Sequence, residues 1–239
     1  MSDFINTLLF GIYPYIALAV LILGTAARYD REPYTWKSGS SQLLRRKQLI
    51  WGSVLFHVGV LVIFFGHLIG LLTPIAIFDA IGISHGAKQL LAVIAGGIAG
   101  IMAIIGATLL IHRRLFDARV RAASSATDTL IIVLLWIQLA LGLLTIPISL
   151  QHLDGHEMVK FMTWAQGIFT FNGAASSYVA DASIVFKLHL TLGLTILLLF
   201  PFTRLVHMLS VPVRYMWRPG YQVVRERNRR AAQTRVPAE

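Results

Sequence analysis

A run of 31 residues without a formal charge, from Gln48 to Phe78, constrains this chain more than any other feature. A membrane core about 30 Å thick needs roughly 20 apolar residues of helix, so this run is long enough to span a membrane. The run contains His57 and His67, and an ionisable residue at membrane depth is costly and usually functional. The alternative is a neutral histidine that only forms hydrogen bonds with a neighbouring helix. We would favour this alternative for a single histidine, but not for two histidines on one span. Because a haem iron binds a neutral imidazole in a dry pocket, we expect these histidines to be haem ligands.

The composition points to a protein that crosses the membrane several times. Of the 239 residues, 56% are hydrophobic and only 13% are charged, and the mean hydropathy is +0.69. These values are typical of polytopic membrane proteins rather than of soluble domains. The chain has no cysteine, which excludes disulfides, cysteine-ligated iron–sulfur clusters and covalent haem attachment. Any haem must therefore be a b-type haem that side chains alone hold.

Hydropathy predicts an all-α integral membrane bundle of five transmembrane helices, at about 4–27, 48–72, 89–111, 129–150 and 182–209. The first segment is not expected to be a cleaved signal peptide, because it lacks a positive n-region and its apolar run is too long. Between the fourth and fifth spans, the segment MVKFMTWAQGIFTF carries Trp and Phe. Such a segment is expected to lie as an interfacial helix among the lipid headgroups.

Basic residues predict the orientation of these spans. Six Lys or Arg lie at 28–47, four at 113–121 and seven at 214–235, against one in each of the other two connections. Because Lys and Arg accumulate in cytoplasmic loops, the N-terminus is expected outside and the C-terminus in the cytoplasm. We therefore divide the chain into a dihaem transmembrane domain at 1–212 and a basic cytoplasmic tail at 213–239.

The fifth predicted span supplies two further histidines, His189 and His207. The second and fifth spans should run antiparallel, so matching depth pairs His57 with His207 on the inner side and His67 with His189 on the outer side. The spacings do not match, because ten residues of helix rise ~15 Å whereas 18 residues rise ~27 Å. Pro201 is expected to kink the fifth span, and helix and haem tilt would absorb the rest of the mismatch.

Other residues near the predicted pairs allow two interpretations each. Four glycines could give a haem room or could serve helix packing: Gly59, Gly66, Gly70 and Gly193. Lys88 could bind a quinone carbonyl or could extend to the headgroups. Four arginines could bind haem propionates or anchor the chain at the cytoplasmic boundary: Arg45, Arg113, Arg114 and Arg204. The remaining four histidines are expected at hydrated helix ends: His85, His112, His152 and His156.

Many segments between about residues 4 and 215 resemble one family, the cytochrome b (gamma) subunit of membrane-bound respiratory nitrate reductase. The most specific of them are RYDREPYTW, SSQLLRRK, FHVGVLVIFFGHLIGLLTP, AGGIAG followed by HRRLF, LGLLTIPISLQHLDGHEM, KLHLTLGLTILLLFPFTRLVH and SVPV. The resemblance does not cover the tail after Arg218.

The resemblance implies a subunit with two haem b that oxidises quinol near the outer membrane face. It implies axial ligation by His57 and His207 at the inner haem and by His67 and His189 at the outer haem, with a quinol site at His67 and Lys88. The implied partners are an iron–sulfur (beta) subunit, a molybdenum catalytic (alpha) subunit, membrane lipid and quinol, with no nucleic acid. The implied location is a bacterial or archaeal-type cytoplasmic (inner) membrane, which the chain crosses several times.

Two other functions stay open at this point. One is a quinol-oxidising dihaem anchor for a different respiratory reductase. The other is a transporter whose buried histidines relay protons. A haem absorption spectrum separates electron transfer from transport.

Overall fold

The computed structural model describes residues 3–36 and 44–210, and every regular element in these ranges is a helix. Five helical segments are long and apolar enough to cross a membrane: Asp3–Arg31, Arg46–Leu72, His85–Phe116, Ala126–Leu150 and Ile184–Phe202. The predicted all-α class and the five predicted spans are therefore confirmed. The tail at 213–239 lies outside the described residues.

The first span comprises α1 (Asp3–Thr7), a π-helical turn at Leu8–Ile12 and α2 (Tyr13–Arg31). The central and later spans are α3 (Arg46–Leu72), α5 (His85–Phe116), α7 (Ala126–Leu150) and α9 (Ile184–Leu199), with the short helices α4 (Ile75–Ala80), α6 (Ala118–Ala122) and α8 (His156–Phe169) between them. Single 3-10 segments lie at Pro33–Thr35, Ala175–Val179, Phe200–Phe202 and Arg204–Ser210. Ser84 and Ser125 cap α5 and α7 by accepting from backbone N–H groups, as N-cap serines commonly do.

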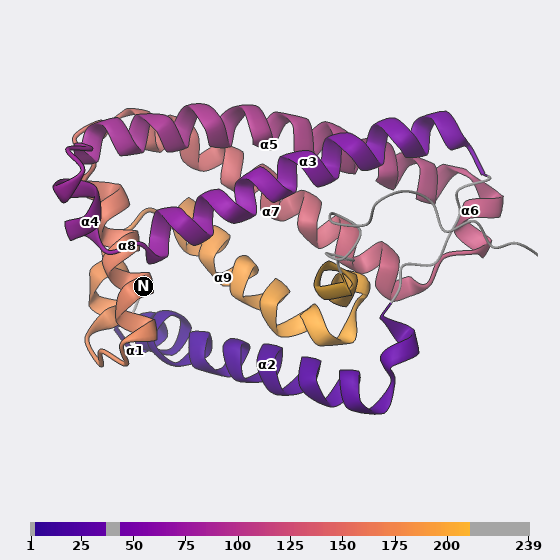
Figure 1. Cartoon of the computed structure of the whole chain (residues 1–239), viewed down its shortest axis with the longest axis horizontal. Helices are drawn as coiled ribbons and strands as arrows, with labels where there is room; N and C mark the ends of the chain where they lie inside the picture. Colours follow the sequence, from indigo (N-terminus) through magenta and orange to yellow (C-terminus); the bar gives the residue numbers. More distant parts are fainter. Residues whose placement is uncertain (1–2, 37–43, 211–239) are drawn as a thin grey trace, which may run out of the picture.

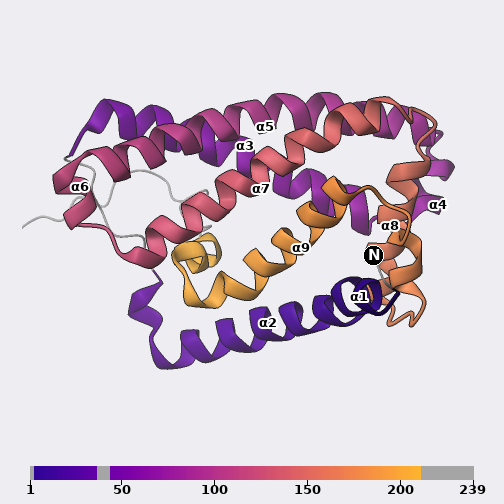
Figure 2. The same cartoon turned by 180° about the vertical axis from the view of Figure 1, so that it is seen from behind.

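The long helices pack in the order α3, α5, α7, α9 and α2 (Figures 1 and 2). Helices α3 and α5 approach so closely that a Cβ at Gly59 would lie 2.5 Å from the carbonyl oxygen of Ala99. A Cβ at Gly106 would overlap the backbone nitrogen of Phe56. Gly59 therefore serves helix packing, which was one of the two predicted interpretations. Helices α4 and α8 lie at the same end of the bundle as α1, and α6 lies at the other end.

The fifth span differs from the continuous helix predicted at 182–209. Helix α9 ends at Leu199, and two 3-10 segments follow it. Pro201 explains this end, because it has no N–H to donate and its ring clashes with the preceding turn. Arg28 of α2 donates to the carbonyl oxygens of Pro201 at 2.7 Å and Thr203 at 2.8 Å. The rise of 18 helical residues therefore does not separate His189 from His207. The chain leaves the axis of α9 after Leu199 instead of continuing as one tilted helix.

Helix α8 buries part of its aromatic surface inside the protein, and its predicted place among the lipid headgroups stays a prediction. Phe161 and Trp164 are buried in a core cluster that contains Phe10. The indole Nε1 of Trp164 donates to the carbonyl oxygen of Phe10 at 2.9 Å. Phe161 and Trp164 thus pack at the end of the bundle, where contact with the first span buries their apolar surface.

Candidate functional site

The structure brings the four histidines of the second and fifth spans together in two pairs. The ring centroids of His57 and His207 lie 6.3 Å apart, and their planes make an angle of 75°. The centroids of His67 and His189 lie 6.2 Å apart, with an angle of 42° between the planes. These are the pairs that depth matching predicts. In each pair, one ring comes from α3 and the other from the chain that begins with α9.

The space beside α3 suits a large planar group. His57 and His67 are exposed although they lie in the middle of a span, and a Cβ at Gly66 or Gly70 would meet nothing within 4 Å. Two metal–imidazole bonds of about 2 Å, plus about 1 Å from each nitrogen to its ring centre, would separate axial rings by roughly 6 Å. Both observed separations fit that value, so the residues present fit a haem between each pair.

Ligand chemistry supports a macrocycle rather than a bare metal ion. In the described part of the chain, no group of three or more His, Cys, Asp or Glu is placed to hold a metal ion. Each pair offers only two nitrogen donors, which is the number that haem iron takes from a protein in bis-histidine ligation.

Three of the four rings are oriented by main-chain carbonyls. Each places its Nδ1 against a carbonyl oxygen one turn earlier on its own chain: His57 against Ser53 at 2.7 Å, His67 against Ile63 at 2.8 Å and His207 against Arg204 at 2.5 Å. Because a carbonyl only accepts, Nδ1 carries the hydrogen and the lone pair of Nε2 remains free to bind a metal.

Helix α7 adds two residues beside His189 that the sequence analysis missed. The amide Nε2 of Gln138 donates to the backbone carbonyl of His189 at 3.1 Å and lies 3.4 Å from its ring Nε2. A Cβ at Gly142 would lie 3.1 Å from Cε1 of His189, so only a glycine leaves space for the ring as it stands. The available signal was Gln138 itself, a polar residue inside an otherwise apolar span.

Lys88 is buried rather than extended to the headgroups. Its side chain donates to the carbonyl oxygen of Gly70 at 3.0 Å and to the sulfur of Met162 at 2.9 Å. The ammonium also lies 3.5 Å from the ring centroid of Phe78. No carboxylate of the described residues forms an ion pair with it. The ammonium thus has one carbonyl and two weak partners, and its carbonyl partner Gly70 lies about one turn of α3 beyond His67.

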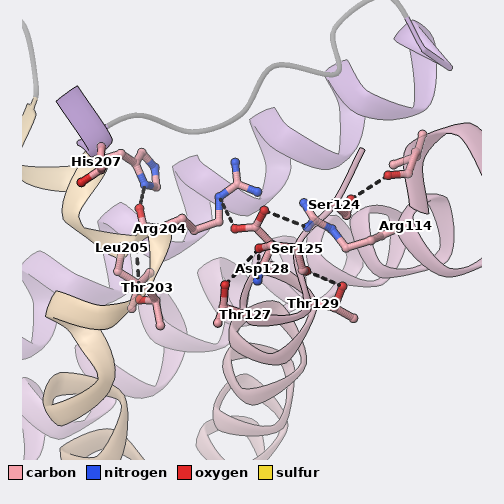
Figure 3. A network of polar contacts seen from close by, with 12 residues as sticks. Arg114, Ser124, Ser125, Thr127, Asp128, Thr129, Thr203, Arg204, Leu205 and His207 are labelled. Atoms are coloured by element: carbon pink, nitrogen blue, oxygen red, sulfur yellow. Dashed lines mark hydrogen bonds and ion pairs between the residues drawn. The ribbon is translucent and has the colours of Figure 1, made fainter. Parts of the chain in front are cut away.

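Two arginines near the His57–His207 pair share one carboxylate (Figure 3). Asp128 lies 3.6 Å from Arg114 and 3.8 Å from Arg204, and all three side chains are largely buried. The backbone of Arg204 also supplies the carbonyl that orients His207. Of the other predicted arginines, Arg45 pairs with Asp117 at 2.9 Å and Arg113 donates to the carbonyl of Leu44. Binding of haem propionates by any of these arginines stays a prediction.

The remaining histidines lie at helix ends, and neither pair includes them. His112, His152 and His156 are exposed, whereas His85 is half-buried and bonds to Asp79 at 3.0 Å.

An ion-pair cluster fixes α8 to the connection that precedes α9. The ammonium of Lys160 lies 2.9 Å from Glu157 and 2.7 Å from Asp181. Hydrogen bonding to Asp181, and then to Glu157, raises the pKa of Lys160, and the bond from Lys160 lowers the pKa of Asp181. Asp181 comes three residues before α9, so this cluster helps to set where that helix begins.

Five helices apolar enough to cross a membrane, with two facing histidine pairs between α3 and the chain from α9 onward, define a membrane protein of a kind suited to hold haem. The chain matches the family model of the nitrate reductase gamma subunit over residues 6–227. It is 51% identical over 226 residues to the respiratory nitrate reductase 1 gamma chain of Escherichia coli K12, covering 95% of this chain and 100% of that one. It is 49% identical to the respiratory nitrate reductase 2 gamma chain of the same organism, with the same coverage. It is 37% identical to the nitrate reductase gamma chain of Bacillus subtilis 168, over 92% of this chain and 98% of that one.

The chain therefore belongs to the nitrate reductase gamma subunit family. The family membership identifies it as a membrane subunit of an oxidoreductase complex that works in electron transport and contains other nitrate reductase subunits.

Proposed function

We propose that this chain is the dihaem b-type subunit that oxidises quinol near the outer membrane face and passes the electrons inward. The observation that carries the proposal is the pair of facing imidazole couples, with ring centroids 6.3 Å and 6.2 Å apart. His57 and His207 would hold the inner haem, and His67 and His189 the outer haem. Family membership supports the proposal, because a respiratory nitrate reductase needs a route for electrons through its membrane subunit.

The protein's part in this chemistry is to hold and orient each ring. A bound haem would supply one-electron transfer. The carbonyls of Ser53, Ile63 and Arg204 orient three imidazoles through Nδ1, which leaves Nε2 directed away from the main chain as the ligand atom. The open side of α3 at Gly66 and Gly70 leaves room for a macrocycle beside His67.

Lys88 and His67 would form the quinol site. The Lys88 ammonium is held by one carbonyl, a thioether and an aromatic face, and the last two are weaker partners than an oxygen acceptor. Binding of quinol would replace the thioether contact by a charge-assisted hydrogen bond to oxygen. The site would lie beside the outer haem, where the protons of the quinol hydroxyl groups leave to the outside while electrons move inward.

The proposed partners are the iron–sulfur (beta) and molybdenum catalytic (alpha) subunits, on the cytoplasmic side. The excess of Lys and Arg at 28–47, 113–121 and 214–235 supports this orientation, with the N-terminus outside and the chain crossing the cytoplasmic membrane five times. The same Lys and Arg side chains would attract an anionic surface of a partner subunit.

A set of histidine variants tests the proposal. Membranes that contain the wild-type complex should show two b-type haem signals. His57→Ala and His207→Ala should each remove the same signal, and His67→Ala and His189→Ala the other, because each iron needs two strong axial donors. His156→Ala, at an exposed helix end, is the matched control and should keep both signals. A wild-type complex without haem absorption would overturn the function, and loss of one common haem in His57 and His189 variants would overturn the pairing.

A further inference from the structure

His189 is the one histidine of the two pairs whose Nδ1 is not oriented by its own main chain. The other three rings bond to carbonyls of their own helical segments, which a side-chain substitution cannot remove. In the described residues, Nδ1 of His189 is buried and has no hydrogen-bond partner. A buried polar atom without a partner is destabilising, so an acceptor is expected when the ring works as a ligand.

Gln138 carries the acceptor that matches this need. Its amide nitrogen already bonds to the backbone carbonyl of His189 and contacts the ring, so the two side chains touch. Its amide oxygen is buried and has no partner among the described residues. Nδ1 of His189 and the amide oxygen of Gln138 are therefore both buried and without a partner, and they belong to two side chains in contact.

Iron ligation would change which ring nitrogen Gln138 can serve. In the structure, the amide N–H lies 3.4 Å from Nε2, whose lone pair it can approach only while that lone pair is free. Once Nε2 gives its lone pair to iron, the ring carries its hydrogen on Nδ1. The amide oxygen of Gln138, which is buried without a partner, is then the free acceptor on the side chain that contacts the ring.

We propose that Gln138 is the positioning residue of His189, whose amide oxygen accepts the Nδ1 hydrogen of the ligating ring. The inference rests on the proposed function, because it needs a haem between His67 and His189. An imidazole that donates its Nδ1 hydrogen to an acceptor is a more basic ligand, which favours ferric over ferrous iron. Gln138 thus lowers the reduction potential of this haem through α7, an element that carries none of the four ligands.

The test measures midpoint potentials of the two haems in the assembled membrane complex, by optical redox titration. In Gln138→Leu, the midpoint potential of the His67–His189 haem should rise by up to about 59 mV. This shift corresponds to a tenfold change in the ferric/ferrous equilibrium for one electron. The other haem in the same molecule is an internal control and should keep its potential. Gln138→Glu retains an acceptor oxygen and should hold the potential at or below the wild-type value.

A second glutamine provides a matched control. Gln48 donates to the carbonyl of Leu109 between α3 and α5, so Gln48→Leu removes a similar interhelical bond away from His189. This variant should leave the potential of the His67–His189 haem unchanged. If Gln138→Leu does not assemble, Gln138→Met preserves the length of the side chain and carries the same expectation.

Two outcomes separate the inference from the proposed function. If Gln138→Leu or Gln138→Met keeps both haems with unchanged potentials, the role of Gln138 is wrong while the proposed function stands. A wild-type complex without a haem at this pair would overturn the proposed function itself.

Discussion

The ammonium of Lys88 bonds to the carbonyl oxygen of Gly70 at 3.0 Å, and Pro74 is the reason that this oxygen is available. In a continuing helix, the carbonyl of Gly70 would accept from the N–H four residues later. That residue is Pro74, which has no N–H. The end of α3 thus leaves an acceptor one turn beyond His67, and Lys88 from the first turns of α5 uses it.

Replacement of Lys88 by methionine tests its part in quinol binding. A hydrogen bond to a charged group contributes about 1.5–3 kcal/mol, so haem reduction by a quinol analogue should slow roughly 10- to 100-fold. Both haem spectra should remain, because Lys88 belongs to neither histidine pair. Rapid-mixing absorption measurements give the rate. Lys160→Met, which removes a lysine of α8, is the control, and an unchanged rate in the Lys88 variant would move the quinol site elsewhere.

A second prediction concerns the contact between α3 and α5. Gly106→Ala places a methyl group into the backbone of Phe56 and should lower the free energy of unfolding by about 1–3 kcal/mol, as overpacked cores do. Gly96→Ala, also in α5, is the matched control, because its methyl group would meet nothing within 4 Å. Thermal unfolding in detergent distinguishes the two variants. Equal stability of both would mean that α3 and α5 separate easily.

Hydropathy predicted the five spans because length and apolar composition alone determine which helices can cross a bilayer. Chain direction was enough to suggest which histidines lie together. The end of α9 at Leu199 was not predicted, because the sequence shows that Pro201 disturbs a helix but not whether the helix continues beyond it. Gln138 was missed for a different reason: its contact with His189 depends on how α7 and α9 pack, which hydropathy does not encode.

A third prediction concerns orientation in the membrane. A reporter fused after Arg218, which lies beyond the described residues, should be active in the cytoplasm, because seven basic residues follow the last span. A reporter inserted at 82–86, where α4 leads into α5, should be active outside. Alkaline phosphatase and a fluorescent protein report the two compartments. Reversed activities would exchange the inner and outer assignments of the two histidine pairs.

A fourth prediction concerns the Lys160–Asp181 ion pair. The pKa of Asp181 is lowered from 3.8 by its bond from Lys160, so the pair adds stability above pH 3.8 and loses it as the pH falls through the lowered value. The pKa of Lys160 is raised from 10.5, so its share persists up to alkaline pH and is lost above 10.5. Because Asp181 is 67% exposed, Asp181→Asn should cost only about 0.2–1 kcal/mol at pH 7.

Unfolding midpoints of the Asp181→Asn variant and the wild type, compared at pH 7 and pH 3, check this expectation. The difference between the proteins should shrink at pH 3. Asp30→Asn, at an exposed position near the end of α2, is the control at both pH values. A difference of the same size at both pH values would assign the stabilisation to something other than the charge of Asp181.

The distance along the chain between paired histidines determines when each pair can form during synthesis. His57 and His207 are 150 residues apart, and His67 and His189 are 122 apart. At about 5–20 residues per second of synthesis, His57 waits roughly 8–30 s for its partner to emerge. During that interval, α3 enters the bilayer with two unpartnered imidazoles. Loading of the His67–His189 pair must therefore follow synthesis of residue 189, and loading of the His57–His207 pair must follow synthesis of residue 207. A nascent chain released before residue 189 can complete neither.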